Sequence, residues 1–105
     1  MRDFINLVEQ AQLTLGDLVE VRTNFEDADF WLIRRGSEKE VGRPVKEYDK
    51  ERFGIKVVRT EVLDANYLYY VMMHLHAQGV WKQIATGTTR LVSIKTKDVL
   101  SIPIG

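Results

Sequence analysis

The stretch LDANYLYYVMMHLHAQG, residues 63–79, decides the fold class of this chain. Its middle is apolar on nearly every side of a helix, and a helix of that kind is normally buried against another layer. Asp64 is placed to cap the first turn, Leu63 and Leu68 occupy the two positions of a hydrophobic staple, and Gly79 supplies a stop. We therefore expect a helix over 65–78 packed on a β-sheet, with these residues facing the sheet: Leu68, Val71, Met72 and Leu75.

Strand patterns lie on the N-terminal side of this helix. DLVEVRT (17–23) alternates between apolar and polar residues, ADFWLIRR (28–35) is a short aromatic-rich run, and IKVVRTEVL (55–63) is rich in β-branched residues. NFEDA (24–28) reads as a turn between the first two. We expect strands in these three stretches.

Two further segments complete the first half of the chain. Residues 3–15 predict an amphipathic helix that is capped by Asp3 and ended by a left-handed Gly16. Residues 36–54 are poor in apolar residues, and they predict a mobile or hairpin-like surface connection in which Pro44 interrupts any strand ladder. The apolar stripe of the helix is Phe4, Leu7, Val8, Ala11 and Leu15.

The chain after Gly79 predicts mainly β-structure. VWKQIA (80–85), RLVSIK (90–95) and VLSIPI (99–104) are the candidate strands, with turns at 87–89 and 96–98. The order of elements indicates an α+β class. We expect one small domain over 1–105, with two helices packed on a mixed, twisted or barrel-like β-sheet.

Composition bounds the possible functions. The chain has 105 residues, 45% hydrophobic and 29% charged, which is typical of a single globular domain. It has no cysteine, which excludes disulfides, thiolate metal ligands and a cysteine nucleophile. The first twelve residues lack the continuous apolar core of a signal peptide, and no run is long enough for a membrane helix. We expect a cytoplasmic protein.

The net charge of zero hides an asymmetry. Residues 1–30 have two basic and seven acidic residues, whereas residues 31–60 have nine basic and five acidic ones. Proteins that bind nucleic acid without specificity usually have an overall basic excess, since phosphate contacts supply most of their affinity. Binding of nucleic acid by this chain would therefore be weak, confined to one basic face, or dependent on a larger assembly.

The sequence gives little support for catalysis or metal binding. His74 and His76 are two residues apart on the expected helix, so they point in different directions and cannot share one ion. We expect one to hydrogen-bond at the helix edge and the other to be solvated. Lys56 has Gly54 where a nuclease motif would need an acidic residue. The sequence predicts no enzyme, no metal site and no cofactor.

The aromatic residues of the expected helix have two interpretations. Tyr67, Tyr69 and Tyr70, with Met72 and Met73, could form a base-stacking platform. Such residues on an apolar helix more often belong to a core, and we expect that here.

Two groups of residues are candidates for a DNA contact. One is a basic cluster at the end of the second strand and in the connection after it. The other is the turn around Gly87, which permits close approach to a backbone. Their side chains could contact phosphates or base edges, although a solvated charged loop and an ordinary hairpin turn would have the same sequences. The candidates are Arg34, Arg35, Lys39, Arg43 and Lys46 in the first group, and Thr88, Thr89 and Arg90 in the second.

The C-terminal half resembles the end of a target-recognition domain from the specificity subunits of type I restriction–modification systems. That family typically has a Tyr/Phe-Leu-Tyr-Tyr helix, a Gly-Thr/Ser turn, an isoleucine-containing segment and a Leu-x-Ile-Pro strand. LTLGDLVEV (13–21) is similar to the opening of the family, and WLIRRG (31–36) to a strand before a glycine turn. The matching residues are Tyr67, Leu68, Tyr69, Tyr70, Gly87, Thr88, Ile94, Leu100, Ile102 and Pro103.

This resemblance implies a non-catalytic module that recognises double-stranded DNA. The long spacer helix of the family has no counterpart in these residues, so its roles do not carry over. The alternative is a protein-interaction module that uses the same fold and binds no DNA alone. Its motivation is the zero net charge and the acidic first 30 residues. Its partner would be a restriction–modification subunit, another protein or a second copy of the chain.

Overall fold

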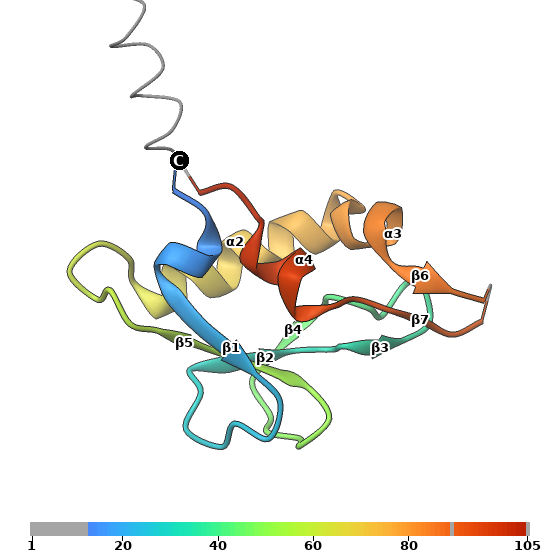
Figure 1. The fold of residues 1–105 in the computed structure, drawn as a ribbon, viewed down its shortest axis with the longest axis horizontal. Helices are drawn as coiled ribbons and strands as arrows, with labels where there is room; N and C mark the ends of the chain where they lie inside the picture. The colour runs from blue at the N-terminus through green and yellow to red at the C-terminus, as the bar shows by residue number, and fades with distance from the viewer. Residues whose placement is uncertain (1–12, 89, 105) are drawn as a thin grey trace, which may run out of the picture.

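The structure is a computed structural model that describes residues 13–88 and 90–104. The helix predicted over 3–15 lies almost wholly outside these residues, and Leu15 opens the short 3₁₀ helix η1 (Leu15–Asp17). Gly16 lies inside η1 without a positive φ, so the prediction of a left-handed stop there is wrong. The α+β class is confirmed, since helices and antiparallel strands pack around one hydrophobic cluster (Figure 1).

The larger sheet is antiparallel and has the strand order β1, β5, β2, β4. Strands β1 and β2 confirm two of the predicted stretches, and β5 confirms the third with a start two residues earlier. Residues 58–63 do not continue β5; they turn, and Val62 N donates to Arg59 O at 2.9 Å. The strands are β1 (Val19–Arg22), β2 (Phe30–Leu32), β4 (Pro44–Val45) and β5 (Phe53–Val57).

A second, smaller sheet has the order β3 (Arg35–Gly36), β7 (Val92–Ser93), β6 (Thr86–Gly87). It joins a segment that follows β2 directly to a hairpin close to the C-terminal end of the chain. All strand pairs in both sheets are antiparallel, so the mixed sheet that was one of the expected arrangements is not formed by the described residues.

The prediction that 36–54 is only a surface connection is wrong. Pro44 and Val45 form strand β4, and Pro44 lies opposite Leu32 of β2. Pro44 does not end the ladder because β4 is an edge strand, where a missing N–H can face outward. Val41 is fully buried, so this segment contributes to the core.

The helix expected over 65–78 is confirmed as α2 (Ala65–Ala77). The Asp64 carboxylate accepts a hydrogen bond from Tyr67 N at 2.9 Å, and Gly79 follows in the left-handed region with φ 77°. The four residues expected to face the sheet all lie in or against the core. Only Leu68 and Met72 are fully buried, with Val71 and Leu75 partly buried beside them.

The tail contains more helix than the sequence predicts. Residues 80–85 form α3 (Val80–Ile84) instead of a strand, and the predicted turn at 96–98 opens α4 (Thr96–Leu100). Asp98 begins α4 by accepting a hydrogen bond from Lys95 N at 2.8 Å. The expected Ile-Pro-Ile strand is reduced to one bridge between Thr14 and Pro103, with Ile104 N donating to Leu13 O at 2.9 Å.

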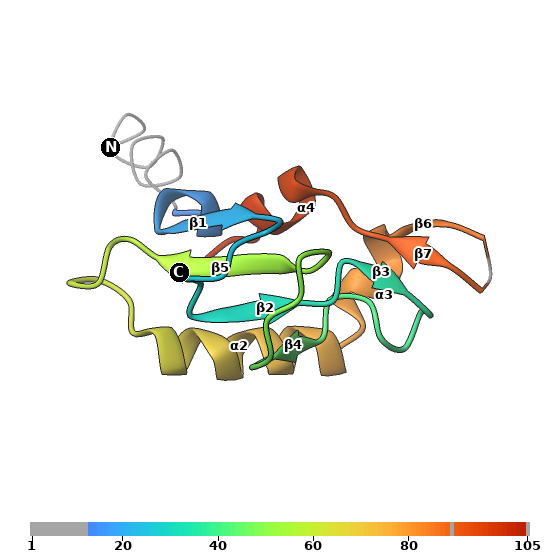
Figure 2. The ribbon, with the colours of Figure 1, turned by 90° about the horizontal axis from the view of Figure 1, so that it is seen from below.

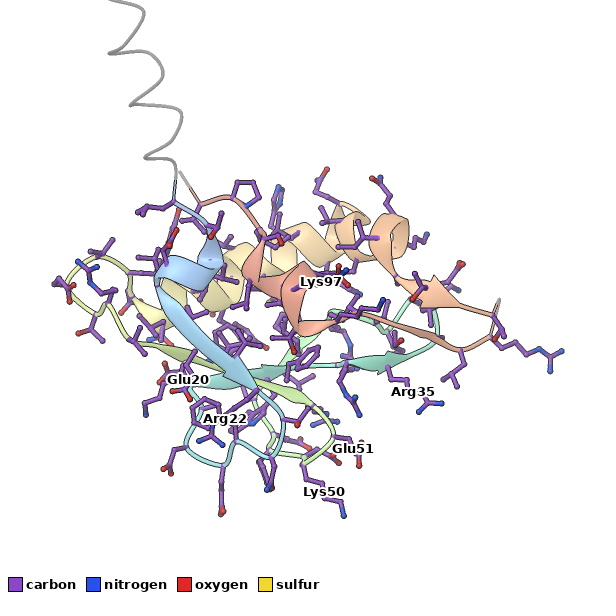
Figure 3. The ribbon with its side chains drawn as sticks, in the orientation of Figure 1. Glu20, Arg22, Arg35, Lys50, Glu51 and Lys97 are labelled. Atoms are coloured by element: carbon purple, nitrogen blue, oxygen red, sulfur yellow. The ribbon has the colours of Figure 1, made fainter. Side chains whose placement is uncertain are left out.

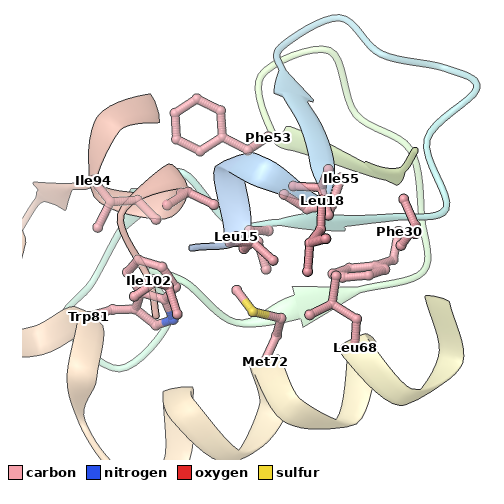
Figure 4. Packing of buried hydrophobic residues seen from close by; sticks show 14 of the residues in the cluster. Leu15, Leu18, Phe30, Phe53, Ile55, Leu68, Met72, Trp81, Ile94 and Ile102 are labelled. Atoms are coloured by element: carbon pink, nitrogen blue, oxygen red, sulfur yellow. The ribbon is translucent and has the colours of Figure 1, made fainter. Parts of the chain in front are cut away.

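The helices lie on one side of the strands, and the core fills the space between the layers (Figure 1). Helix α2 runs along the β2–β4 side of the larger sheet, while α4 lies near β1 (Figure 2). Leu68 and Met72 rise from α2 toward Phe30 and Leu18 (Figure 4). The small sheet projects beyond this core, and it carries the candidate site.

Candidate nucleic-acid interface

A groove of about 680 Å³ runs along the small sheet and reaches the ends of β1 and β5. Its charged lining is entirely basic, since no described Asp or Glu is among the residues that line it. Hydroxyl side chains and a few apolar residues make up the rest. The basic residues are Arg34, Arg35 and Lys95, and the hydroxyl residues are Thr23, Thr86, Thr88, Ser93 and Thr96.

The strand pairing of the small sheet explains why these residues meet. Arg35 lies opposite Ser93, Ser93 lies opposite Thr86, and Ile94 N donates to Arg34 O at 3.0 Å. Strand β7 therefore joins the two groups of candidates that the sequence keeps about fifty residues apart. Arg34, Arg35 and Thr88 line one groove, a relation that the sequence left open.

Gly87 is required by the geometry of this hairpin. Its φ is +141°, and a Cβ on it would lie 2.3 Å from Leu91 O. The predicted tight turn at this glycine is thus confirmed. Thr88 N donates to Leu91 O at 3.0 Å, and the Thr88 hydroxyl accepts from Leu91 N at 3.1 Å. The Thr88 hydroxyl is therefore already engaged in shaping the turn. Thr89 lies outside the described residues, and Arg90 is exposed.

The two arginines of the groove differ in how they are held. Arg34 donates from Nε to Glu51 O at 2.8 Å and from Nη2 to Glu51 Oε2 at 2.7 Å. Its side chain is 32% exposed, so the guanidinium is fixed and its charge is partly balanced. Arg35 is exposed and makes no ion pair with any described residue. Figure 3 shows Arg35 projecting from β3 away from the helices.

The other basic candidates lie elsewhere. Arg43 pairs with Glu40 at 2.9 Å, and the Lys46 ammonium sits 4.2 Å from the centre of the Tyr69 ring. Lys39 lines a separate groove beside His76 and Trp81. The structure therefore divides the cluster that the sequence presents as one group, and only Arg34 and Arg35 of it reach the groove.

Lys95 is the functional candidate that the sequence interpretation missed. It was assigned to the end of a strand, whereas it is an exposed residue at the N-cap of α4 and lines the groove. The available signal was its position five residues after Arg90 in the same basic stretch. Ser93 and Thr23 were missed as well, since isolated hydroxyl residues carry no recognisable pattern.

The histidines and the aromatic residues of α2 complete the comparison with the sequence. His76 Nε2 lies 2.7 Å from Lys39 O and His74 is exposed, as expected. The described residues contain no group of three or more potential metal ligands. Tyr69 packs edge-on against Phe30 at 5.4 Å, which confirms its place in the core. Tyr67, Tyr70 and Met73 are exposed, so the core assignment is wrong for them.

A comparison with protein-family models, curated proteins and solved structures gave no match for this chain. Among the described residues, no helix has the length and apolar content to cross a membrane.

Proposed function

We propose that this chain is a non-catalytic module that binds double-stranded DNA, as its resemblance to a target-recognition domain implies. The observation that carries the proposal is the groove beside the small sheet, whose charged lining is basic only. The chain has 15 acidic and 15 basic residues, so a groove without acidic lining is a local departure from its overall balance. Such a groove attracts a polyanion.

The chemistry of the lining fits a sugar–phosphate backbone. Arg35 and Lys95 supply charge, and the threonine and serine hydroxyls supply neutral donors of the kind that contact phosphate oxygens. Arg34 is held by Glu51, which fixes the direction of its guanidinium. A two-stranded ribbon fits the major groove of B-DNA, so the β6–β7 hairpin with exposed Arg90 is the candidate for reading bases.

A duplex titration tests the proposal. With a labelled duplex at about 50 mM salt, binding should be measurable, and it should weaken steeply as salt increases. Arg35→Ala and Lys95→Ala should each lower the slope of log affinity against log salt by about 0.9, the value for one phosphate contact. Lys97→Ala is the matched control, because Lys97 is an exposed lysine of α4 that does not line the groove.

The result that would reject DNA binding by the isolated chain is equally definite. Electrostatic affinity is exaggerated at about 50 mM salt, so a chain that binds no duplex there does not use this groove for DNA. Equal effects of Lys95→Ala and Lys97→Ala would assign the binding to general charge and not to the groove.

The alternative candidate is a protein-interaction module that binds a restriction–modification subunit or another protein. One observation favours it: Tyr67 and Tyr70 of α2 are 64% and 67% exposed, and exposed aromatic residues mark protein interfaces. An absence of duplex binding, together with a partner lost on substitution of these tyrosines, would support this alternative.

A further inference from the structure

The outer face of α2 has no charge. No Asp, Glu, Lys or Arg occurs between Asp64 and Lys82, although 29% of the whole chain is charged. Tyr67, Tyr70 and Met73 follow one another at three-residue spacing, so they lie on the same side of the helix, away from Leu68 and Met72. Their exposed fractions are 64%, 67% and 45%. Solvent-facing helix surfaces normally have charged residues, whereas this one combines exposed tyrosine and methionine side chains with only a few polar ones, Asn66, His74 and Gln78.

An apolar groove borders the N-terminal end of this face. It has a volume of about 370 Å³ and its lining contains no charged residue. Tyr67 belongs both to the groove and to the exposed face, whereas Tyr70 stands one turn further along α2 and does not line the groove. A projecting aromatic ring and an apolar groove thus lie next to each other. The other lining residues that matter here are Val62, Val71, Pro103 and Ile104.

We propose that this face binds a second copy of the chain, with the two α2 helices antiparallel across a two-fold axis. A crossing centred between Tyr67 and Tyr70 places Tyr70 of each copy against Tyr67 and the apolar groove of the other. A two-fold interface requires one self-complementary patch. If a residue of one copy contacts a second residue of the partner, that second residue in the first copy makes the same contact in return. A ring beside a groove meets that requirement.

Charge favours a second copy as the occupant. Identical surfaces that are charged repel each other, but this face is uncharged and the chain has a net charge of zero at pH 7. Charged groups near this face are engaged within the chain, and one of them is Lys46, whose ammonium lies 4.2 Å from the centre of the Tyr69 ring, itself 5.6 Å from the centre of the Tyr70 ring. The Asp64 carboxylate caps Tyr67 N, and Arg59 is paired with Glu61, a contact that lowers the pKa of Glu61. These contacts limit the repulsion between like charges when two copies approach.

The area that the dimer would bury sets its expected affinity. Aromatic side chains bury about 150–250 Å² each, and stable interfaces bury about 800 Å² per partner. Two tyrosines that are about two-thirds exposed, with Met73 and the groove walls, give an area below that of a stable interface and typical of a weak, transient contact. The dimer should therefore dissociate on dilution.

Sedimentation velocity tests the proposal on the full chain. From about 1 µM to about 500 µM, a range that brackets micromolar dissociation constants, the chain should pass from monomer to dimer. Tyr70→Ala keeps a strong helix former and should raise the dissociation constant at least tenfold, as truncation of a central tyrosine does. Tyr70→Glu would bury a carboxylate in an apolar groove and should abolish the dimer.

Leu91→Glu is the matched control, because Leu91 is an exposed apolar residue on the β6–β7 hairpin, away from α2. It should leave the dimer unchanged. A monomer at every concentration would overturn the proposal, and so would a dimer that persists in both Tyr70 variants. Circular dichroism of each variant separates lost folding from lost association, and Tyr70→Ala remains informative where Tyr70→Glu does not fold.

Discussion

Gly42 and Trp81 illustrate a relation between single residues that the sequence does not reveal. A Cβ at Gly42 would lie 2.1 Å from Trp81 Cδ1, inside the core. Gly42 belongs to a segment with few apolar residues, and its partner comes thirty-nine positions later, so no local pattern connects them. Gly79, by contrast, could be predicted because it follows a helix whose end is marked by the loss of apolar periodicity.

Replacing each of these glycines separates close packing from backbone conformation. Gly42 and Gly79 have nearly the same φ, +81° and +77°, but nothing lies within 4 Å of a Cβ at Gly79. Gly79→Ala should cost about 1 kcal/mol of unfolding free energy, and Gly42→Ala about 2–5 kcal/mol, because it adds a steric clash to the same conformational cost. Urea unfolding measures both, and equal losses would show that Trp81 is not packed on Gly42.

Glu51 offers a second test at the residue scale. Glu51→Gln removes a negative charge beside the groove, while the hydrogen bond from Arg34 Nε to the main-chain oxygen of residue 51 can remain. Duplex affinity at about 50 mM salt should rise a few-fold, with a stability loss below about 1 kcal/mol because the pair is partly exposed. Glu40→Gln removes the partner of Arg43, which does not line the groove, so it should raise the affinity less, through the long-range field alone. An equal or larger rise with Glu40→Gln would contradict the placement of the site.

Helix α2 was predictable as an element, and α3 and α4 were not. Helix α2 could be predicted from local signals: Asp64 caps its first turn, Leu68 belongs to the hydrophobic staple, and Gly79 ends it. Such signals do not depend on the rest of the fold. Helices α3 and α4 have only five residues each, too few for a helical period to appear against β-branched neighbours. Their form is set by long-range burial of Trp81 and Val99.

The inner face of α2 predicts different stability losses for two leucines. Leu68 is fully buried and Leu75 is partly buried, so the two leucines expected to behave alike from sequence are separated by the structure. Leu68→Ala should cost about 2–5 kcal/mol of unfolding free energy, and Leu75→Ala less. Thermal or denaturant unfolding gives both values. A larger loss at Leu75 would mean that α2 is rotated relative to the core described here.

At the scale of the whole molecule, the sequence could predict the α+β class but only part of the site. Arg34, Arg35 and the Gly87 turn were identified as separate candidates, and the pairing of β3 with β7 brings them together. That pairing joins Arg35 to Ser93, and strand register over such a separation depends on the complete fold. The same fold places Arg43 and Lys46 outside the groove, where Arg43 pairs with Glu40 and Lys46 contacts the Tyr69 ring.

The loop between β1 and β2 has three acidic residues, Glu26, Asp27 and Asp29, and these are the subject of the last prediction. Asp29 accepts a hydrogen bond from Val57 N at 2.8 Å, so its neutralisation would disturb β5 as well as the charge. Glu26 and Asp27 are exposed, and their carboxylates form no ion pair with a described residue. Neutralising both by Glu26→Gln and Asp27→Asn should raise duplex affinity slightly at about 50 mM salt through the long-range field.

Salt distinguishes this field from a local effect. The screening length falls from about 14 Å near 50 mM salt to about 5–6 Å near 300 mM, so the gain should disappear at the higher concentration. Fluorescence anisotropy with the same duplex measures the affinities, and unfolding curves confirm that both proteins are folded. A gain that persists at about 300 mM would place Glu26 or Asp27 in direct contact with the DNA. Absence of any gain at low salt would mean that the duplex binds outside the field of this acidic loop, and therefore on a surface other than the groove beside β3 and β7.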